Sequence, residues 1–270
     1  MKAASFDYVR PSTLAAALDL LATEDGIVRA IAGSQSLGPM LNLRLVQPDM
    51  LVDITGLPEL QSIRDEAGTL VVGACVTHAR LEDGSYPDAT RGVLAAVAAG
   101  IAYRAIRNRG TIGGSIAHAD PAADWLVTAT ALGAEVVLSS KAERRSLTMP
   151  AFILGVFETA LGQGELITEL RFPGLSAQAR WGYYKFCRKT GEFAQASAAV
   201  LIDPARGLVR SVIGAASGQP IVVTDPEILR QDGQAERVAA LLADTALGDD
   251  PYQIRIHTVA LRRAIAKATA

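Results

Sequence analysis

The sequence contains few of the residues that bind metals or form disulfides. Its 270 residues include 2 cysteines, Cys75 and Cys187, and 3 scattered histidines, His78, His118 and His257. A [2Fe–2S] cluster normally takes four cysteine ligands, or two cysteines with two histidines, and a disulfide framework needs several cysteine pairs. We therefore expect no iron–sulfur centre, zinc site or disulfide framework in this chain, and any redox chemistry must use an organic cofactor.

Long apolar runs and an excess of one charge are also missing. No stretch approaches the roughly 18 apolar residues of a membrane span, and the N-terminus has no signal-peptide core. The 26 basic and 28 acidic residues leave a net charge of −2, which gives no electrostatic reason to bind nucleic acid or an anionic membrane. We expect a cytoplasmic protein with no membrane insertion and no nucleic-acid partner.

Aromatic residues make up 5% of the chain, so Ala, Leu and Val must build the core. The residue pattern predicts helices and strands that alternate in two units and a third unit of sheet followed by helices, which together make an α+β fold. The units are expected at residues 1–57, 58–175 and 176–270. Strands are expected over 27–33, 50–56, 69–76, 134–140 and 165–173, and a hairpin over 194–217. Helices are expected over 11–23, 93–106 and 120–133, and after about 225.

Capping residues support two of these helices. Ser12 or Thr13 can cap the helix over 11–23. In the helix over 120–133, Asp120 is the expected N-cap, Pro121 stands at the first helical position and Gly133 follows the last turn.

Two short segments rich in glycine and hydroxyl residues are candidate phosphate-binding loops. In AGSQSLGP (32–39), Gly33 and Gly38 can adopt positive φ, and the residues between them offer successive backbone amides. In GTIGGS (110–115), Gly113 and Gly114 have no Cβ, so the backbone can approach a phosphate. The alternative interpretation is structural: each segment is a turn leading into a helix.

The acidic residues after the second segment affect how a phosphate would bind. Carboxylates in the first turn of a helix would repel a phosphate placed on the helix terminus. The amides of the two loops are therefore the better phosphate ligands, and Asp124 is available to accept a hydrogen bond from a ribose hydroxyl. Two such loops, one in each of the first two units, fit a dinucleotide in the crevice between the units.

Three segments together resemble one protein family. AGSQSLGPMLNLRLVQPDMLVDITG (32–56), IRNRGTIGGSIAHADPAADW (106–125) and YYKFCRKTGEFAQASAAV (183–200) are similar to the medium, FAD-binding subunit of the molybdenum hydroxylases. This is the xanthine dehydrogenase and carbon monoxide dehydrogenase flavoprotein family. The resemblance implies an FAD-binding fold of the vanillyl-alcohol-oxidase (PCMH) type, with FAD subdomains at 1–57 and 58–175 and a C-terminal domain at 176–270.

The resemblance also implies which residues bind FAD. Those expected at the pyrophosphate are Ala32, Gly33, Ser34, Gln35, Ser36, Leu37, Thr111, Ile112, Gly113, Gly114 and Ser115. Asp124 would hold the ribose, Ile167 would lie near the isoalloxazine, Lys185 would be a polar contact of the flavin, Tyr183 would cover one ring face, and Ile101 would complete the site. The family commonly has glycine at position 34 and asparagine at position 115, so Ser34 and Ser115 depart from its pattern.

Two further residues near these motifs have more than one interpretation. His118 is interpreted as a local hydrogen-bonding residue rather than a covalent flavin attachment, and Cys187 as an inert thiol rather than a redox-active one. Trp125 and Trp181 are interpreted as packing residues.

The implied function is electron transfer. Substrate hydroxylation would occur at a molybdenum cofactor in a large partner subunit, and electrons would pass through [2Fe–2S] clusters of a small partner subunit to FAD in this chain. The acceptor would then be NAD, a quinone, a cytochrome or oxygen, and the assembly a dimer of heterotrimers. Two alternatives stay open: a stand-alone FAD-dependent oxidoreductase of the same fold, and an assembly module without a cofactor.

Overall fold

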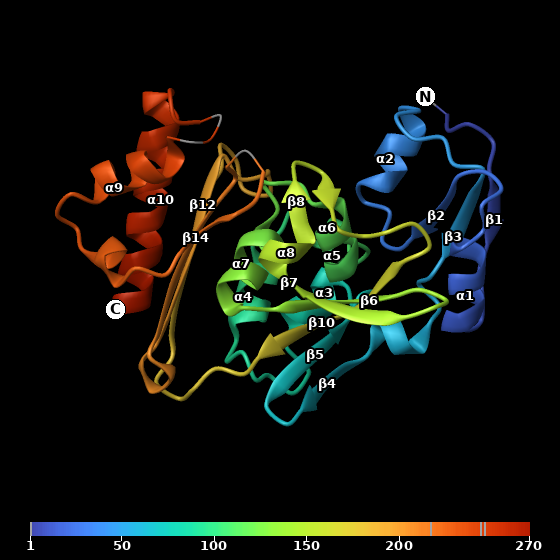
Figure 1. Cartoon of the computed structure of the whole chain (residues 1–270), viewed down its shortest axis with the longest axis horizontal. Coiled ribbons are helices and arrows are strands. Elements are labelled where there is room, and N and C mark those ends of the chain that lie inside the picture. Colours follow the sequence, from blue (N-terminus) through green and yellow to red (C-terminus); the bar gives the residue numbers. More distant parts are fainter. Residues whose placement is uncertain (1, 217, 244, 246) are drawn as a thin grey trace.

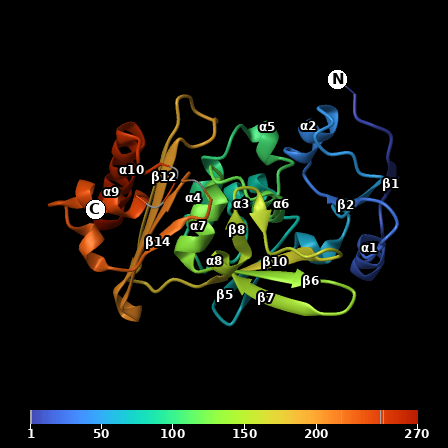
Figure 2. The same cartoon turned by 45° about the horizontal axis from the view of Figure 1, so that its top comes forward.

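Three sheets follow one another along the length of the molecule. The computed structural model describes residues 2–216, 218–243, 245 and 247–270. The N-terminal unit and the C-terminal helices lie at opposite ends, with the helix-rich second unit between them (Figures 1 and 2). Within the described residues, no helix is both long and apolar enough to cross a membrane.

The first unit is a small parallel sheet of order β1-β3-β2 covered by a helix. Its elements are β1 (Asp7–Val9), α1 (Leu14–Leu21), β2 (Val28–Ile31), α2 (Leu37–Asn42) and β3 (Met50–Asp53). Thr13 is the N-cap of α1, and its hydroxyl oxygen accepts from the Ala16 amide at 3.2 Å. The expected helix and both expected strands are present. Strand β1 was not predicted because three residues are too few to show a period.

The second unit is an antiparallel sheet of order β4-β5-β10-β6-β7 with helices packed on one face. The strands are β4 (Ile63–Glu66), β5 (Thr69–Gly73), β6 (Glu135–Ser139), β7 (Arg144–Thr148) and β10 (Leu166–Pro173), with a separate hairpin of β8 (Ile153–Gly155) and β9 (Glu158–Thr159). The helical segments are η1 (Pro58–Gln61), α3 (His78–Asp83), α4 (Val93–Ala99), α5 (Arg104–Arg107), α6 (Ile112–His118), α7 (Asp124–Leu132) and α8 (Met149–Phe152).

The helix expected over 93–106 is broken in two. Helix α4 ends at Ala99, and the chain turns through Ala102, whose φ is +43°, before α5 begins. The carbonyls exposed at the break accept hydrogen bonds from side chains, one of which is far away in the sequence. Arg107 donates to the oxygens of Ile101 and Ala102 at 2.8 and 3.1 Å, and Lys185 donates to that of Gly100 at 2.9 Å. The apolar pattern alone predicted one helix because it contains no signal for these contacts of Arg107 and Lys185 with the backbone.

The helix expected over 120–133 begins later than predicted. Helix α7 starts at Asp124, and Asp120 instead accepts from the Ala122 amide at 2.9 Å in a turn before the helix. Asp120 therefore is not the N-cap. Gly133 ends the helix in the left-handed conformation, with φ +72°, as predicted.

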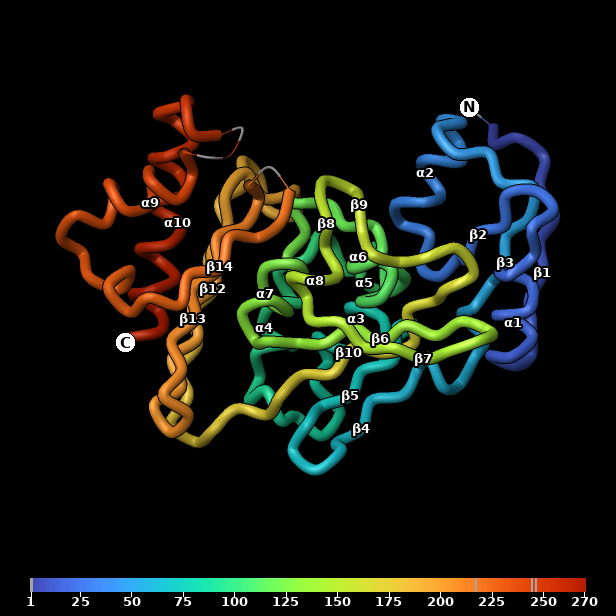
Figure 3. Tube along the Cα trace, viewed as in Figure 1, coloured from blue at the N-terminus to red at the C-terminus, as the bar shows by residue number. Residues whose placement is uncertain are grey.

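The third unit is an antiparallel sheet of order β11-β12-β13-β14 that lies between helices of two units. Helix α10 covers one face and α7 of the second unit covers the other (Figure 3). The predicted hairpin is formed by β12 and β13 and closed by η2, although position 217 lies outside the described residues. The elements are β11 (Arg180–Phe186), β12 (Ala196–Asp203), η2 (Pro204–Arg206), β13 (Leu208–Gly214), β14 (Ile221–Val223), η3 (Pro226–Leu229), α9 (Gln234–Leu242) and α10 (Pro251–Thr269).

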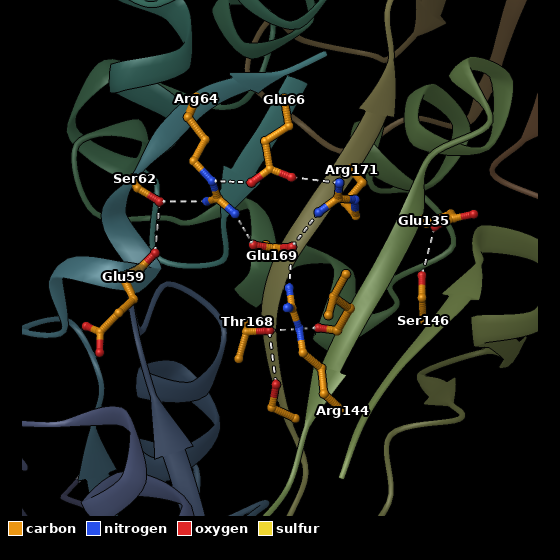
Figure 4. Close-up of polar contacts among 12 residues, drawn as sticks. Glu59, Ser62, Arg64, Glu66, Glu135, Arg144, Ser146, Thr168, Glu169 and Arg171 are labelled. Carbon is orange, nitrogen blue, oxygen red and sulfur yellow. Dashed lines mark hydrogen bonds and ion pairs between the residues drawn. The ribbon is translucent and has the colours of Figure 1, made fainter. Parts of the chain in front are cut away.

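An ion-pair cluster covers the helix-free face of the second sheet (Figure 4). The Glu169 carboxylate of β10 is 2.8 Å from Arg64 of β4, 2.6 Å from Arg144 of β7 and 3.0 Å from Arg171. Because successive strand residues point to opposite faces, Leu170 and Phe172 enter the core while Glu169 and Arg171 do not. A carboxylate that is 9% exposed needs such partners, and here they join three strands of the sheet.

The contact between β11 and α10 gives a prediction about stability. Gly182 lies so close to α10 that a Cβ atom would overlap the Ala264 carbonyl and lie 2.8 Å from the Ala268 nitrogen. We expect Gly182→Ala to lower the free energy of unfolding by about 2–3 kcal/mol through overpacking. The control is Gly207→Ala, which has open space around it but a φ of +60° and should cost about 1 kcal/mol. Equal losses in urea unfolding would contradict the close contact.

Candidate functional site

A cavity of about 580 Å³ lies where the three units meet. This volume is in the range of ligand-binding pockets. The first unit contributes the segment after β2, the second contributes α6 and the segments around it, and the third contributes Lys185 and residues 191–193. Most of the residues predicted to bind a nucleotide line this cavity: Ala32, Gly33, Ser34, Gln35, Ser36, Leu37, Ile101, Thr111, Gly114, Ser115, Asp124 and Lys185.

Four predicted site residues do not line the cavity. Ile112 and Ile167 are 0% and 3% exposed and belong to the core of the second unit. Gly113 is packed against Ala74, where an added Cβ would lie 2.7 Å from the carbonyl oxygen. Tyr183 points its hydroxyl at Asp124 and is not a wall of the cavity. The roles of Ile167 and Tyr183 at a flavin ring stay predictions.

The segment 33–36 lines the cavity and contains four successive backbone amides without a partner among the described residues. The amides of Gly33, Ser34, Gln35 and Ser36 donate to no acceptor within the part of the chain that the structure describes. The Gln35 side chain donates to the Gly33 carbonyl at 2.9 Å, which turns the peptide groups of this segment. Ser34 has a φ of +61°, in the left-handed region that favours glycine. A concave row of N–H groups of this kind suits an anionic oxygen.

The two predicted loops are joined by a direct backbone contact. A Cβ atom on Gly33 would overlap the Arg109 carbonyl and lie 2.8 Å from the Gly110 Cα. Only glycine permits this approach. The glycine of the first loop therefore brings the first unit against the second, which is a different role from approaching a phosphate.

The second predicted loop is the first turn of a helix. Helix α6 begins at Ile112, and Thr111 caps it by accepting from the Gly114 amide at 3.1 Å. The Ile112 and Gly113 amides donate to the Val76 and Ala74 carbonyls at 3.0 and 2.9 Å. The prediction that this segment offers amides to a phosphate is therefore wrong for Ile112, Gly113 and Gly114. Gly114 lines the cavity without donating to it.

Asp124 is a buried carboxylate with two partners from the third unit. Its Oδ1 accepts from the Tyr183 hydroxyl at 2.6 Å, and Lys185 Nζ lies 2.9 Å from the same oxygen. Both side chains of the ion pair are about one-tenth exposed. Burial, and then the Asp124 charge, raises the pKa of Tyr183 well above its ordinary value, so the phenol stays protonated and remains a donor. These contacts anchor β11 to the start of α7 at the cavity wall.

His78 forms another part of the wall, which sequence analysis did not assign to the site. Its side chain is 6% exposed, and its Nδ1 accepts from the Trp125 indole N–H at 3.1 Å. Burial, together with the Arg107 charge, lowers the pKa of His78 to about 4. The imidazole is therefore neutral near pH 7. No spacing signal pointed to this pair, because the two residues are brought together only by the fold.

The other cavity-lining residues were not among the site residues predicted from the sequence, although most belong to the three segments that resemble the family: Arg29, Met40, Val46, Ala102, Ile106, Gly110, Ala117, His118, Asp120, Ala123, Gly191, Glu192 and Phe193. The ring of His118 packs at 5.0 Å from that of Phe157, and it makes no side-chain hydrogen bond among the described residues, contrary to expectation. Cys187 is partly exposed and does not line the cavity, whereas Cys75 is buried, and burial raises the pKa of its thiol to about 12.

A second cavity, of about 290 Å³, adjoins the first. The two share Ala32, Gly33 and Thr111 as walls, and the second is bordered by Arg80, Asn108 and Arg109. Among the described residues, no group of three or more His, Cys, Asp or Glu side chains is placed to hold a metal ion.

The comparisons with known proteins identify the family. Residues 4–175 match the family model described as the FAD binding domain in molybdopterin dehydrogenase. The chain belongs to this family. It is the medium, FAD-binding subunit of a molybdenum hydroxylase, an oxidoreductase whose own cofactor is FAD.

Individual relatives agree with this assignment. Over 203 residues, the FAD-binding subunit is 39% identical to caffeine dehydrogenase subunit beta of Pseudomonas sp. strain CBB1, covering 75% of this chain and 69% of that protein. Over 235 residues it is 35% identical to the carbon monoxide dehydrogenase medium chain of Hydrogenophaga pseudoflava, covering 86% and 79%.

Solved structures confirm the fold over the full length. The FAD-binding subunit superposes on a chain of carbon monoxide dehydrogenase from Hydrogenophaga pseudoflava with a TM-score of 0.90 and 32% identity, covering 100% and 99% of the two chains. For quinoline 2-oxidoreductase from Pseudomonas putida 86 the TM-score is 0.85 at 31% identity, covering 99% and 98%.

The left-handed conformation of Ser34 gives a prediction. A non-glycine residue in this region carries strain of about 1–2 kcal/mol, which exceeds the entropy that glycine adds to the unfolded chain. We expect Ser34→Gly to raise the free energy of unfolding by about 0.5 kcal/mol. Ser36→Gly is the matched control, because Ser36 has a φ of −106° and glycine there should lower the free energy of unfolding by about 0.5–1 kcal/mol. Urea unfolding with the same sign for both variants would contradict the strain.

The pKa of His78 gives a prediction about pH. The folded-state pKa of about 4 lies below the ordinary 6.5, so the unfolded chain binds more protons between these values. Stability is therefore full above pH 6.5 and is lost as the pH falls toward 4. Between pH 7 and pH 5 this loss is about 2 kcal/mol from His78 alone. Denaturant unfolding of His78→Gln should show a correspondingly smaller fall, whereas an unchanged difference between the two pH values would contradict the neutral imidazole.

Proposed function

We propose that this chain is the electron-transfer subunit of a heterotrimeric molybdenum hydroxylase and that it holds FAD in the cavity between the three units. The observation that carries the residue assignment is the row of amides at 33–36, which belong to a segment that lines the cavity and have no acceptor within the described residues. Such a row matches the needs of a pyrophosphate. The amide row begins at Gly33, which contacts Arg109 and Gly110 of the second unit. This position supports a nucleotide bound where the first two units touch.

Other residues of the cavity fit the remaining parts of FAD. Thr111, Gly114 and Ser115 also line the cavity, and the two hydroxyl side chains are available as polar contacts, although the Thr111 oxygen also accepts from the Gly114 amide at 3.1 Å. Asp124 and Lys185 are the charged pair at the wall toward the third unit, where a carboxylate oxygen can accept from a sugar hydroxyl. The adjoining smaller cavity supports a dinucleotide rather than a mononucleotide, since the two spaces share their walls at Gly33 and Thr111.

Bound FAD supplies the redox chemistry, accepting electrons from one partner and passing them to another. The chain's own part is to bind and orient the cofactor, and the described residues of the cavity do not form an evident substrate-activating dyad. In the proposed assembly, a large subunit carries the molybdenum cofactor and a small subunit carries the [2Fe–2S] clusters. The relatives that are named as a medium chain or a subunit of a dehydrogenase support such partners. A dimer of heterotrimers in the cytoplasm, with NAD, a quinone, a cytochrome or oxygen as acceptor, completes the proposal.

The cofactor assignment can be tested on the isolated chain. Gly114→Val places two methyl groups at a position that lines the cavity, so we expect FAD affinity to fall at least about tenfold, the effect of losing roughly 1.4 kcal/mol. Ala142→Val, at an exposed position in the turn between β6 and β7, is the control and should bind FAD as the original chain does. Flavin fluorescence titration measures both, with thermal unfolding to establish that the variants are folded. Equal affinities in all three proteins would contradict the cavity assignment.

The place of the chain in an assembly needs a second experiment. Expression together with the products of neighbouring genes should yield a complex whose FAD is reduced when substrate is added to the large subunit. If the isolated chain instead turns over a substrate by itself, it is a stand-alone oxidoreductase and the electron-transfer proposal fails. Comparing NAD, a quinone analogue, cytochrome and oxygen as oxidants of the reduced complex then identifies the acceptor.

A further inference from the structure

His78 is held in one protonation state and one tautomer by its neighbours. The Trp125 indole has an N–H and no acceptor, so the His78 Nδ1 that lies 3.1 Å from it must be unprotonated. In a neutral imidazole the proton then resides on Nε2. Trp125 is fully buried and part of the core of the second unit, so this arrangement is fixed by packing.

The protonated nitrogen lies on the cavity side of this pair. His78 Nε2 has no hydrogen-bond partner among the described residues. Unlike Nε2 of His257, which is also unpartnered, it is not completely enclosed by protein atoms. Because His78 as a whole is 6% exposed and lines the cavity, Nε2 is the part that reaches it. A Cβ atom on Gly110 would lie 3.0 Å from this nitrogen, so the glycine leaves the position open.

This nitrogen lies next to the contact between the two nucleotide loops. Gly110, which adjoins the His78 ring, is also the residue against which Gly33 packs. The His78 backbone amide donates to the Gly110 carbonyl at 2.9 Å, which fixes the ring relative to that contact. The Nε2–H group of neutral His78 is a hydrogen-bond donor at the cavity wall, and an oxygen atom of a bound ligand could accept from it.

We propose that His78 binds FAD by donating a hydrogen bond from Nε2 to an oxygen of the cofactor, and that Trp125 is the positioning residue that sets its tautomer. The inference rests on the proposed location of FAD in this cavity. The acceptor is an oxygen of either the phosphates or the flavin half of the cofactor, and these two sources are separated below.

Nuclear magnetic resonance of the unmodified chain, with ¹⁵N-labelled histidine, tests the tautomer first. His78 should show the Nε2–H form. His257 is the internal reference of opposite tautomer, because its Nδ1 lies 2.8 Å from the Gln253 carbonyl, which only accepts. Addition of FAD should shift the Nε2–H resonance of His78 and leave the Nδ1–H resonance of His257 in place. An Nδ1–H form of His78, or no shift when FAD binds, would overturn the proposal.

Affinity measurements test the donor. His78→Phe keeps a ring but removes the donor and should weaken FAD binding roughly 3- to 10-fold, the worth of one net hydrogen bond. His78→Gln can return an N–H near the Nε2 position and should recover most of that loss. Trp125→Phe leaves both tautomers open and should weaken binding by a smaller factor. Equal affinity of His78→Phe and the original chain for FAD would overturn the proposal.

Binding of ADP and FMN, two fragments of FAD, shows whether the acceptor oxygen belongs to the phosphates or to the flavin half. If the Kd of ADP, measured by direct titration without FAD, is higher for His78→Phe than for the original chain, the acceptor belongs to the phosphates. If only FMN binding is weakened, the acceptor belongs to the flavin half. Failure of the original chain to bind FAD at all would refute the proposed function, whereas normal binding with unchanged variants refutes only the role of His78.

Discussion

The site depends on a backbone contact between two segments that are far apart in the sequence. Gly33 follows β2 in the first unit and lies against Arg109 and Gly110 in the second, at a distance that no side chain would permit. This contact sets the width of the cavity, because the amide row at 33–36 is on one side of it and α6 is on the other. The first two units therefore meet beside the cavity at two glycines, without side chains between them.

Buried polar groups connect the third unit to this arrangement. Lys185 divides its donors between the Asp124 carboxylate and the Gly100 carbonyl, which is exposed by the break after α4. Arg107 satisfies the next two carbonyls of the same break and forms a two-pronged ion pair with Glu82 at 2.8 and 2.9 Å. A helix end that is buried without such partners would be costly. The irregular segment around Ile101 is therefore a defined wall of the cavity.

Much of this arrangement was readable from the sequence, and the exceptions have physical causes. Seven of the strands in the three sheets were predicted from alternation and glycine placement, as were the end of α7 at Gly133 and the N-cap of α1 at Thr13. The Gly-Gly pair at 113–114 was assigned to a turn because glycine disfavours helices, but the fold needs Gly113 inside α6, where its missing Cβ admits Ala74. The Asp-Pro pair at 120–121 resembles a helix start and forms a preceding turn instead.

The residues that sequence analysis missed share one property: their roles come from partners distant in the chain. His78 is an ordinary residue after the N-cap of α3 until Trp125 packs beside it, and residues 191–193 reach the cavity only because β11 is anchored at Asp124.

Since the cavity has walls from all three units, a molecule that contacts them all stabilises their mutual docking by the free energy with which it binds. With FAD in the proposed site, cofactor affinity and the attachment of the third unit at Lys185 and Asp124 are linked in this way.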